Sequence, residues 1–425
     1  MNLEETFHRL LGLDDGWRVV SASYEMTQER FVIQVEETPK LWEQESAKLG
    51  YAVRCYDHVE PLRWRHLNVF NKESEIVCAL PRGRYWDEGA SLKGAEKVYR
   101  VTPPWEGKSK HFTRDFEAFA LTLMREMPVK KAGEILGETD KRLWRMLFLH
   151  VAEAYRRLSM EEVVWIGADE MNRRKGHNYL TVFADLKARR VLFATEGKDA
   201  STWEAFVEEL LKHNGHPKAI TQAAIDMSPA YIKGVKANLG NAEIVFDKFH
   251  VIREVNEAVE KVRRLEAQAP GGAKDWLAKS QWIWRKNPEN WTEGEALRTV
   301  PLEKQHLLTA RAYQMRLVLQ GIYNCRRAST AREKFKRWCR WVGRRCARKG
   351  SEVLEPMGKA AEMVKNHLEG ILAHWKQGLT TAFMEGLNSL FSATKRKARG
   401  YRSIEYLKTM LYFVAGKLTI PCPTH

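Results

Sequence analysis

Near the middle of the chain, short apolar runs alternate with amphipathic stretches, and this alternation constrains the fold more than any other feature. Val163–Ala168, Tyr179–Ala184 and Arg190–Ala194 are rich in β-branched and aromatic residues, so three consecutive strands are predicted there. Two further predicted strands, Ile220–Ile225 and Ile244–Phe246, alternate with helical stretches. The predicted order is βββαβαβα, which indicates an α/β protein with a mixed sheet.

That order is typical of an RNase H-like core, and the flanking segments differ from it in composition. A small β-rich module comes first and a helix-turn-helix follows it. An all-α insertion, basic and rich in tryptophan, precedes the last helix of the core. The predicted regions are 1–105 for the β-rich module, 110–160 for the helix-turn-helix, 161–267 for the first part of the core, 268–376 for the insertion and 377–420 for the last part of the core.

A helical hairpin with a basic second helix is predicted before the core. An apolar stripe with helical spacing runs from Phe116 to Met127, and Gly137 marks a turn before Lys141, Arg142 and Arg145. A helix, a short turn with glycine and a basic helix are typical of a helix-turn-helix that binds the major groove. We expect the three basic residues to contact DNA. The alternative is an ordinary helical hairpin.

The charge of the chain also indicates nucleic acid. There are 70 Lys and Arg against 54 Asp and Glu, a net charge of +16. Because phosphate contacts dominate nucleic-acid affinity, a protein this basic is expected to bind a polyanion. The alternative is a charged surface that only confers solubility. The sequence contains neither a signal peptide nor an apolar run of membrane-spanning length, so we expect a cytoplasmic protein with no membrane partner.

Three acidic residues suit metal-dependent phosphodiester chemistry. Asp169 and Asp226 end the first and fourth predicted strands, and Glu385 lies on a helical stretch late in the chain. In an RNase H-like sheet these two strands are neighbours, so residues 57 apart (226 − 169) can share an ion. Carboxylates are the ligands that Mg²⁺ prefers, and two ions about 3.5–4 Å apart are a recurrent arrangement for cutting and joining phosphodiesters.

Each of these acids also has an ordinary structural explanation. An aspartate after a strand is often a turn or cap residue, and a single glutamate on a helix is most often at the surface. Asp185 and Asp247 also end predicted strands and compete for the metal role. The six cysteines include no C-x-x-C pair, so their spacing indicates neither a zinc site nor a disulfide framework.

Several motifs together resemble bacterial insertion-sequence transposases of the ISL-three family. The matching segments are Ile166–Glu170, Lys175–Val182, Asp226–Tyr231, Val245–Val251 and Glu385–Asn388, with Arg63–Leu67 as a landmark nearer the amino terminus. The resemblance implies a DDE enzyme on an RNase H-like fold. Its catalytic, metal-binding acids fall on Asp169, Asp226 and Glu385, and the implied cofactor is Mg²⁺ or Mn²⁺, two ions per active site.

The resemblance and the basic run after Glu385 suggest further site residues. Asp247 and His250 match a D-x-x-H signature, and we expect them to be accessory residues that steady the second acid or touch a phosphate. A plain structural hydrogen bond between the two remains the alternative. Phosphate contacts are predicted for Arg396, Arg399 and Arg402, although such basic runs at helix ends are often solvated.

Members of the resembled family usually carry a Cys-rich zinc ribbon in the amino-terminal part. Here Leu41–Gln44 stands near the place of a C-P-x-C segment, and Tyr85 stands where a later cysteine is expected, although Cys55 is retained. A closed zinc site needs four ligands, so we expect no structural zinc and a ribbon fold held by packing alone.

The resemblance therefore predicts a DDE transposase, associated with the bacterial nucleoid. It would bind the terminal inverted repeats of an insertion sequence and catalyse Mg-dependent cleavage and transfer of DNA strands. The implied partners are double-stranded DNA, at the element ends and at the target, and a second copy in a homodimeric DNA complex. The tryptophans of the insertion could clamp DNA or stabilise a flipped base. The alternatives are a catalytically silent, transposase-derived DNA-binding regulator and a metal-dependent nuclease without strand transfer.

Overall fold

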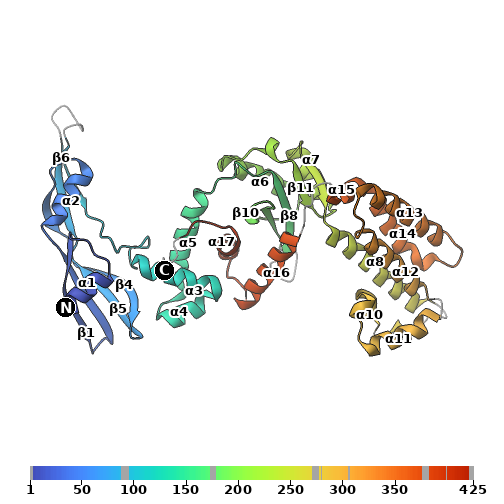
Figure 1. Ribbon diagram of the computed structural model, residues 1–425, viewed down its shortest axis with the longest axis horizontal. Coiled ribbons are helices and arrows are strands. Elements are labelled where there is room, and N and C mark those ends of the chain that lie inside the picture. Colours follow the sequence, from blue (N-terminus) through green and yellow to red (C-terminus); the bar gives the residue numbers. More distant parts are fainter. Residues whose placement is uncertain are drawn as a thin grey trace. The chain divides into compact units, whose positions relative to one another are not determined.

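The computed structural model of this chain contains two compact units (Figure 1). The first comprises Met1–Leu158 and Ser392–His425, and the second comprises Ser159–Phe391. The structure describes residues 3–87, 95–172, 179–269, 277–278, 280–304, 307–375, 382–398 and 400–420. The finer division into five regions remains a prediction from the sequence.

The first unit begins with a β-rich module of two sheets. Its helices are α1 (Leu3–Leu10) and α2 (Lys40–Leu49). One sheet has the strand order β1-β2-β5-β4 and the other has the order β3-β6-β7. The strands are β1 (Trp17–Glu25), β2 (Arg30–Glu37), β3 (Arg54–His58), β4 (Leu62–Val69), β5 (Lys72–Cys78), β6 (Pro81–Asp87) and β7 (Ala95–Arg100). Trp17, Trp64 and Trp105 meet edge to face in the core of this module, with ring centroids 5.0 and 5.9 Å apart.

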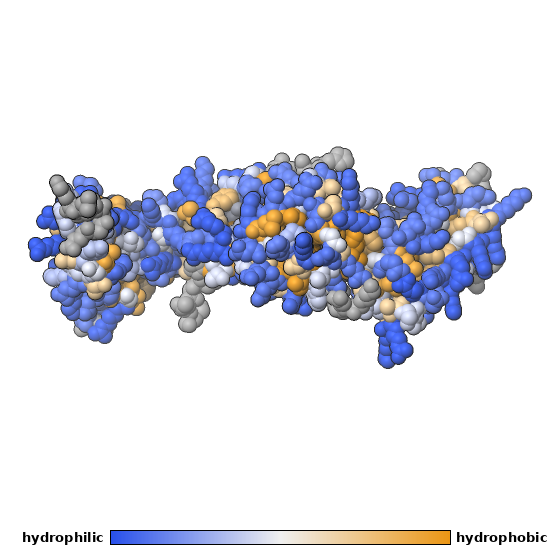
Figure 2. All heavy atoms as spheres, turned by 90° about the horizontal axis from the view of Figure 1, so that it is seen from above, coloured by the Kyte–Doolittle hydropathy of each residue, from blue (hydrophilic) through white to orange (hydrophobic). Residues whose placement is uncertain are grey.

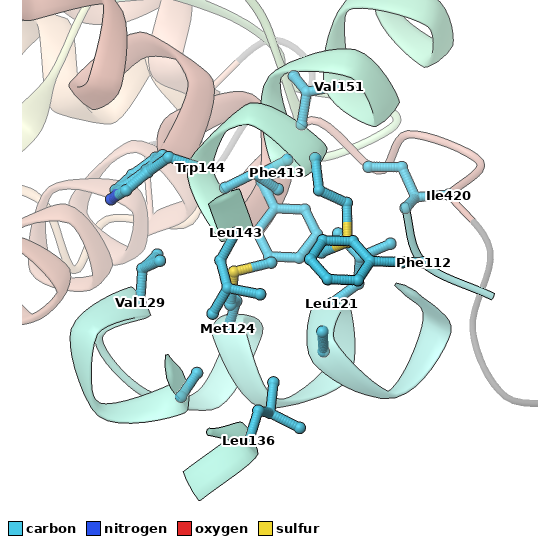
Figure 3. Close-up of a cluster of buried hydrophobic side chains, with 14 of the residues drawn as sticks. Phe112, Leu121, Met124, Val129, Leu136, Leu143, Trp144, Val151, Phe413 and Ile420 are labelled. Carbon is cyan, nitrogen blue, oxygen red and sulfur yellow. The ribbon is translucent and has the colours of Figure 1, made fainter. Parts of the chain in front are cut away.

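Three helices follow in the arrangement that the sequence predicts: α3 (Arg114–Glu126), α4 (Val129–Leu136) and α5 (Asp140–Arg156). Gly137, at φ 74°, ends α4 in the left-handed conformation that glycine adopts without steric cost. The three helices enclose one apolar core, drawn in Figure 3.

The carboxy-terminal helix packs against this core as well. Phe413 of α17 (Ile404–Ala415) and Ile420 just after it are buried among side chains of α3, α4 and α5 (Figure 3). The sequence places the whole of 377–420 in the catalytic core. That placement is wrong for α17, because its apolar stripe is satisfied by the helix-turn-helix instead.

The second unit is built on a five-stranded mixed sheet of order β10-β9-β8-β11-β12. β8, β9 and β10 pair antiparallel, whereas β11 runs parallel to both β8 and β12. The strands are β8 (Trp165–Asn172), β9 (Tyr179–Asp185), β10 (Arg190–Glu196), β11 (Gln222–Ile225) and β12 (Glu243–Phe246), and the helices between and after them are α6 (Ser201–Lys212), α7 (Pro229–Asn238) and α8 (Lys248–Gln268). The elements follow one another in the order that the sequence predicts.

Helices cover both faces of this sheet. On one face Phe183 of β9 stacks on Phe206 of α6, with ring centroids 4.4 Å apart, and Tyr231 of α7 bonds through its hydroxyl to Thr181 of β9 at 2.8 Å. On the other face lies the start of α16 (Ala382–Lys397), where Met384 is buried. The two faces therefore carry different chemical environments for residues that alternate along β8.

The described part of the insertion is helical. Its α-helices are α10 (Gln281–Arg285), α11 (Glu293–Lys304), α12 (Leu308–Ile322), α13 (Ala328–Cys346), α14 (Glu355–Asn366) and α15 (Leu368–Leu372), with 3₁₀ turns at Pro288–Asn290, Glu352–Leu354 and Ala373–Trp375. Trp284 and Trp338 are buried, and among the described tryptophans of this region only Trp282 is exposed, at 63%. Trp276 lies outside the described residues.

Hydrophilic residues cover most of the face shown in Figure 2, as expected for a chain with so many charges. No helix in the described ranges combines the length and the apolar character needed to cross a membrane.

Candidate active site

Asp169 and Asp226 stand level on neighbouring strands. β11 pairs with β8 in parallel with a constant offset, Gln222 with Trp165 and Ala224 with Gly167, so partners are 57 residues apart (222 − 165). Asp226 follows β11 directly and is 57 residues from Asp169, so the same register sets the two side by side. Neighbouring strands are about 4.8 Å apart, so side chains that share a register position can share a metal ion.

The predicted boundary of the first strand is wrong. The sequence places Asp169 just after the strand, but β8 continues to Asn172 because β9 remains paired with it, Asp169 lying opposite Val182. Only the pairing with β11 stops earlier. Asp169 therefore sits on rigid backbone beyond the last β11 partner, which fixes the direction of its side chain more firmly than a loop would.

A third aspartate lies at the same level. β12 pairs with β11 with an offset of 21 (243 − 222), and Asp247 is 21 residues from Asp226. Asp247 is also the N-cap of α8, because its Oδ1 accepts a hydrogen bond from Phe249 N at 2.9 Å. Asp226 accepts one from Ser228 N, also at 2.9 Å, at the start of α7. These local bonds orient the carboxylates and leave each with further acceptor capacity.

His250 lies between two of these aspartates. Its Nε2 is 3.9 Å from Asp169 Oδ1, and its Nδ1 is 3.4 Å from Asp247 Oδ2, a contact too poorly aligned for a good hydrogen bond. Burial works to lower the pKa of His250, but the contact with Asp247 and the charge of Asp169 outweigh it and raise the pKa above its ordinary value. The predicted accessory pair thus reaches the first acid.

Glu170 is a member of this acidic group that the sequence reasoning missed. Burial, followed by the negative charge of Asp226, raises its pKa, with Lys198 opposing and Asp169 adding to the effect. Its neighbour in sequence, Asp169, points to the opposite face because side chains alternate along a strand. The signal in the sequence was the acidic doublet itself, since two adjacent acids inside a buried strand are rare.

The start of α16 lies on the face of β8 that carries Asp169. A Cβ added to Gly167 would come within 2.8 Å of Met384 Sδ, so Met384 packs directly on Gly167. Gly167 and Asp169 are two residues apart and share a face. The backbone of Glu385 follows Met384 in the same helical turn. The Glu385 side chain lies outside the described residues.

Asp185 stands apart from this group. It pairs with Ile166, three residues before Asp169 on β8, and shares the face of Phe183 rather than that of Asp169. Its Oδ1 accepts bonds from Lys187 N and Ala188 N at 3.0 and 2.9 Å. It is a buried turn residue, 3% exposed, which agrees with its lower ranking in the sequence prediction.

The basic residues predicted on the second helix of the helix-turn-helix have different surroundings. Lys141 and Arg145 are exposed and share one face of α5, four residues apart. Arg142 is half-buried: it holds Glu138 with two bonds of 2.8 Å and stacks over the Phe112 ring at 4.6 Å. Its internal contacts favour a structural role.

The basic residues after Glu385 are also separated. Arg396 is exposed on α16. Arg402 pairs with Asp140, the first residue of α5, at 2.9 Å. Arg399 lies outside the described residues.

Comparison with known proteins gives two family matches. Residues 166–411 match a family model described as a transposase, and residues 101–151 match the helix-turn-helix domain of transposase family ISL3. The chain is 28% identical over 353 residues to the transposase for insertion sequence element IS1001 of Bordetella parapertussis, covering 81% of this chain and 82% of that protein. It is 24% identical over 412 residues to the transposase for insertion sequence element IS1557 of Mycobacterium tuberculosis (strain ATCC 25618 / H37Rv), covering 88% and 86%.

Proposed function

This chain belongs to the transposase family ISL3, and we propose that it cuts and joins DNA at the ends of an insertion sequence, with divalent metal ions held by Asp169, Asp226 and Glu385. The observation that carries the proposal is the common register of Asp169 and Asp226 on two parallel strands. We assign the five-stranded sheet to the RNase H-like fold, with residues 268–376 as its insertion.

The residues present fit divalent metal ions. Carboxylate oxygens of Asp169 and Asp226 meet at one edge of the sheet, and a third aspartate stands beside them. Hard cations such as Mg²⁺ or Mn²⁺ take oxygen ligands of this kind. Two ions, when bound, would activate the attacking oxygen and stabilise the leaving oxygen of the phosphodiester.

The protein residues then have separate roles. Asp169 and Asp226 hold the ions, and Glu385 completes the ligand set from α16. His250, in contact with Asp169 and Asp247, holds the first acid in place. A water molecule attacks the phosphodiester at the element end and releases a 3′-OH. That hydroxyl attacks a phosphodiester of the target strand in the same site.

DNA binding is assigned to several basic surfaces. Lys141 and Arg145 present exposed charge on the second helix of the helix-turn-helix, where major-groove contacts are made in this motif. Arg396 and Arg402 remain candidates for phosphate contact. On α13 the buried face carries Phe335 and Trp338, and the exposed face carries Lys334, Lys336, Arg337, Arg340 and Arg344. Such a row of charges follows a DNA backbone well.

Two further parts of the proposal concern the complex. The exposed Trp282 is the described tryptophan of the insertion best placed to stack on an unpaired base, because the others are partly or fully buried. Two element ends must be held together for transfer, so we propose a homodimer in the DNA complex.

The test is to incubate the purified protein with a DNA duplex carrying the element end, with Mg²⁺, with Mn²⁺ and with chelator. We expect cleavage with either metal, none with chelator and none for Asp226→Ala. Asp185→Ala is the matched control and should retain cleavage if it folds. Cleavage by Asp226→Ala would refute the assignment of the acids. Binding without cleavage under every condition would indicate a DNA-binding regulator instead.

A further inference from the structure

The β-rich module contains a second group of metal-ligating side chains, far from the proposed chemistry in sequence. Glu37, Cys55 and His58 each offer one ligand atom, and these three atoms all lie within 4.8 Å of one another. His58 Nε2 is 2.6 Å from Glu37 Oε1. It is the only such three-residue group that the described ranges contain.

A β-bulge brings Cys55 and His58 to the same side of their strand. Residues three apart normally face opposite sides of a strand. In β3 the register shifts between Cys55 and Asp57, so Tyr56 is an extra residue without a partner on β6. Cys55 then stands opposite Gly83 and His58 opposite Pro81. Gly83 and Pro81 are two residues apart, so their partners share a face.

Glu37 reaches the same place from the other sheet. It is the last residue of β2, in register with the buried Ile33 and Val35, which face the core of the module. Its side chain is 18% exposed, whereas that of Glu36, on the outer face, is 57% exposed. An inward-facing carboxylate at a strand end, next to an imidazole and a thiol, is an unusual arrangement for a residue that serves only solubility.

We propose that Glu37, Cys55 and His58 bind one zinc ion. The donor set contains sulfur, nitrogen and oxygen, which Zn²⁺ accepts together, whereas Mg²⁺ and Ca²⁺ take oxygen. At ordinary zinc-ligand distances, tetrahedral ligand atoms are about 3.5 Å apart, so small side-chain rotations close the site. The His58 side chain is 42% exposed, which leaves room for water as the fourth ligand.

The ion would join the two sheets of the module. Glu37 belongs to the sheet β1-β2-β5-β4, whereas Cys55 and His58 belong to the sheet β3-β6-β7. Because a metal that binds only the folded state adds its binding free energy to folding, zinc would stabilise the packing of one sheet on the other. The role is structural and independent of DNA cleavage. The sequence gave no hint of it, since cysteine spacing cannot reveal a site with one cysteine.

The test uses full-length protein freed of metal by chelation and titrated with Co²⁺, which takes the same ligands as Zn²⁺ and is coloured. We expect a thiolate-to-cobalt charge-transfer band in the near ultraviolet, saturating at one ion per chain and removed by Zn²⁺. The carboxylate site of the second unit contains no sulfur and cannot produce this band. Cys55→Ser should abolish the band. Cys325→Ser, a cysteine of the other unit, is the matched control and should retain it.

A second variant covers the case in which Cys55→Ser fails to fold. His58→Gln changes a half-exposed side chain, so we expect it to fold and to keep a cobalt–thiolate band with affinity lowered at least about 100-fold. Zinc should raise the thermal midpoint of the wild-type chain and not that of Cys55→Ser. Absence of the band in the wild-type chain, or an unchanged band in both variants, would overturn the proposal and leave Glu37 and His58 as a plain hydrogen-bonded pair.

Discussion

Acidic residues serve different ends in the two units. In the first unit, buried carboxylates each face a donor or a base: Glu117 faces His150, and Glu106 faces Arg100. At the sheet edge of the second unit, Asp169, Asp226 and Asp247 share a register position and so stand beside one another. The difference teaches how to separate structural from chemical carboxylates, because acids that serve only stability are not arranged to repel.

Glu117 is the clearest member of the structural class. It is 2% exposed and accepts bonds from Lys108 N, Ser109 N and Ser109 Oγ, as well as facing His150 Nε2 at 2.9 Å. Burial works to raise its pKa, but the bonds from His150 and Ser109 prevail and lower it. Every acceptor position is satisfied, so no capacity remains for an external ligand.

The largest contrast is expected from Asp226→Asn. Removing one metal ligand should lower the cleavage rate on the order of 10³-fold or more. The free energy of unfolding should change by no more than about 0.5 kcal/mol, or rise, because a charge is removed from a crowded group. Single-turnover cleavage and chemical denaturation measure the two effects. A loss of stability that parallels the loss of activity would place Asp226 in the structural class.

Glu117→Gln should show the reverse pattern. Breaking a buried, hydrogen-bonded pair costs about 3–5 kcal/mol, because the partner groups stay buried without compensation. We expect that loss in the unfolding of the first unit. Cleavage by the fraction that remains folded should be unchanged per molecule. If denaturation shows less than about 1 kcal/mol, the pair contributes no more than an exposed one.

Acid should weaken the first unit through His66. Burial lowers the pKa of this residue from 6.5 to about 4, and its Nδ1 lies 2.9 Å from Thr113 Oγ1, the N-cap of α3. The unfolded chain takes up the proton near pH 6.5 and the folded chain only near pH 4. The stabilisation is therefore complete above about pH 6.5 and declines as the pH falls toward 4, by up to about 3 kcal/mol.

Thermal unfolding between pH 7 and pH 4 measures this decline. His66→Gln removes the titrating group, so its stability should depend less on pH across that window, whatever its absolute value. An equal slope in the variant and the wild-type chain would assign the acid sensitivity to other groups.

The smallest effect is expected from Gly167→Ala, which leaves all the acids in place. The new Cβ would approach Met384 Sδ and Leu186 Cδ2, both to 2.8 Å, and these flexible side chains would have to shift. We expect a displacement of α16, and with it of Glu385, that slows cleavage roughly 10–100-fold. Stability should fall by about 1 kcal/mol. Unchanged cleavage would separate α16 from the site.

The sequence predicts the sheet well because β-branched runs carry their own signal. It also places Asp169 and Asp226 57 residues apart on neighbouring strands, and the register agrees. It misses the extension of β8 to Asn172, since pairing with β9 rather than local propensity sets the strand end. Tertiary pairing of this kind is not visible in a single segment.

Three other features were beyond the reach of the sequence. The stripe of α17 fits any apolar core, so nothing in it indicates the helix-turn-helix as its partner. Lys141 and Arg142 are adjacent and alike in charge, yet only the fold shows that Arg142 holds Glu138. The grouping of Cys55 with His58 depends on a bulge, which shifts side chains by one register position.

The central claim is that Asp169 and Asp226 are metal ligands in one site. The direct measurement is DNA-end cleavage by Asp169→Cys and Asp226→Cys, each in Mg²⁺ and in Mn²⁺, with Asp185→Cys as the control. Thiolate is a poor ligand for Mg²⁺ and a better one for softer ions. We predict that both variants are inactive in Mg²⁺ and regain cleavage in Mn²⁺, while the control behaves alike in both. Full activity in Mg²⁺, or no recovery by either variant in Mn²⁺, would contradict the account.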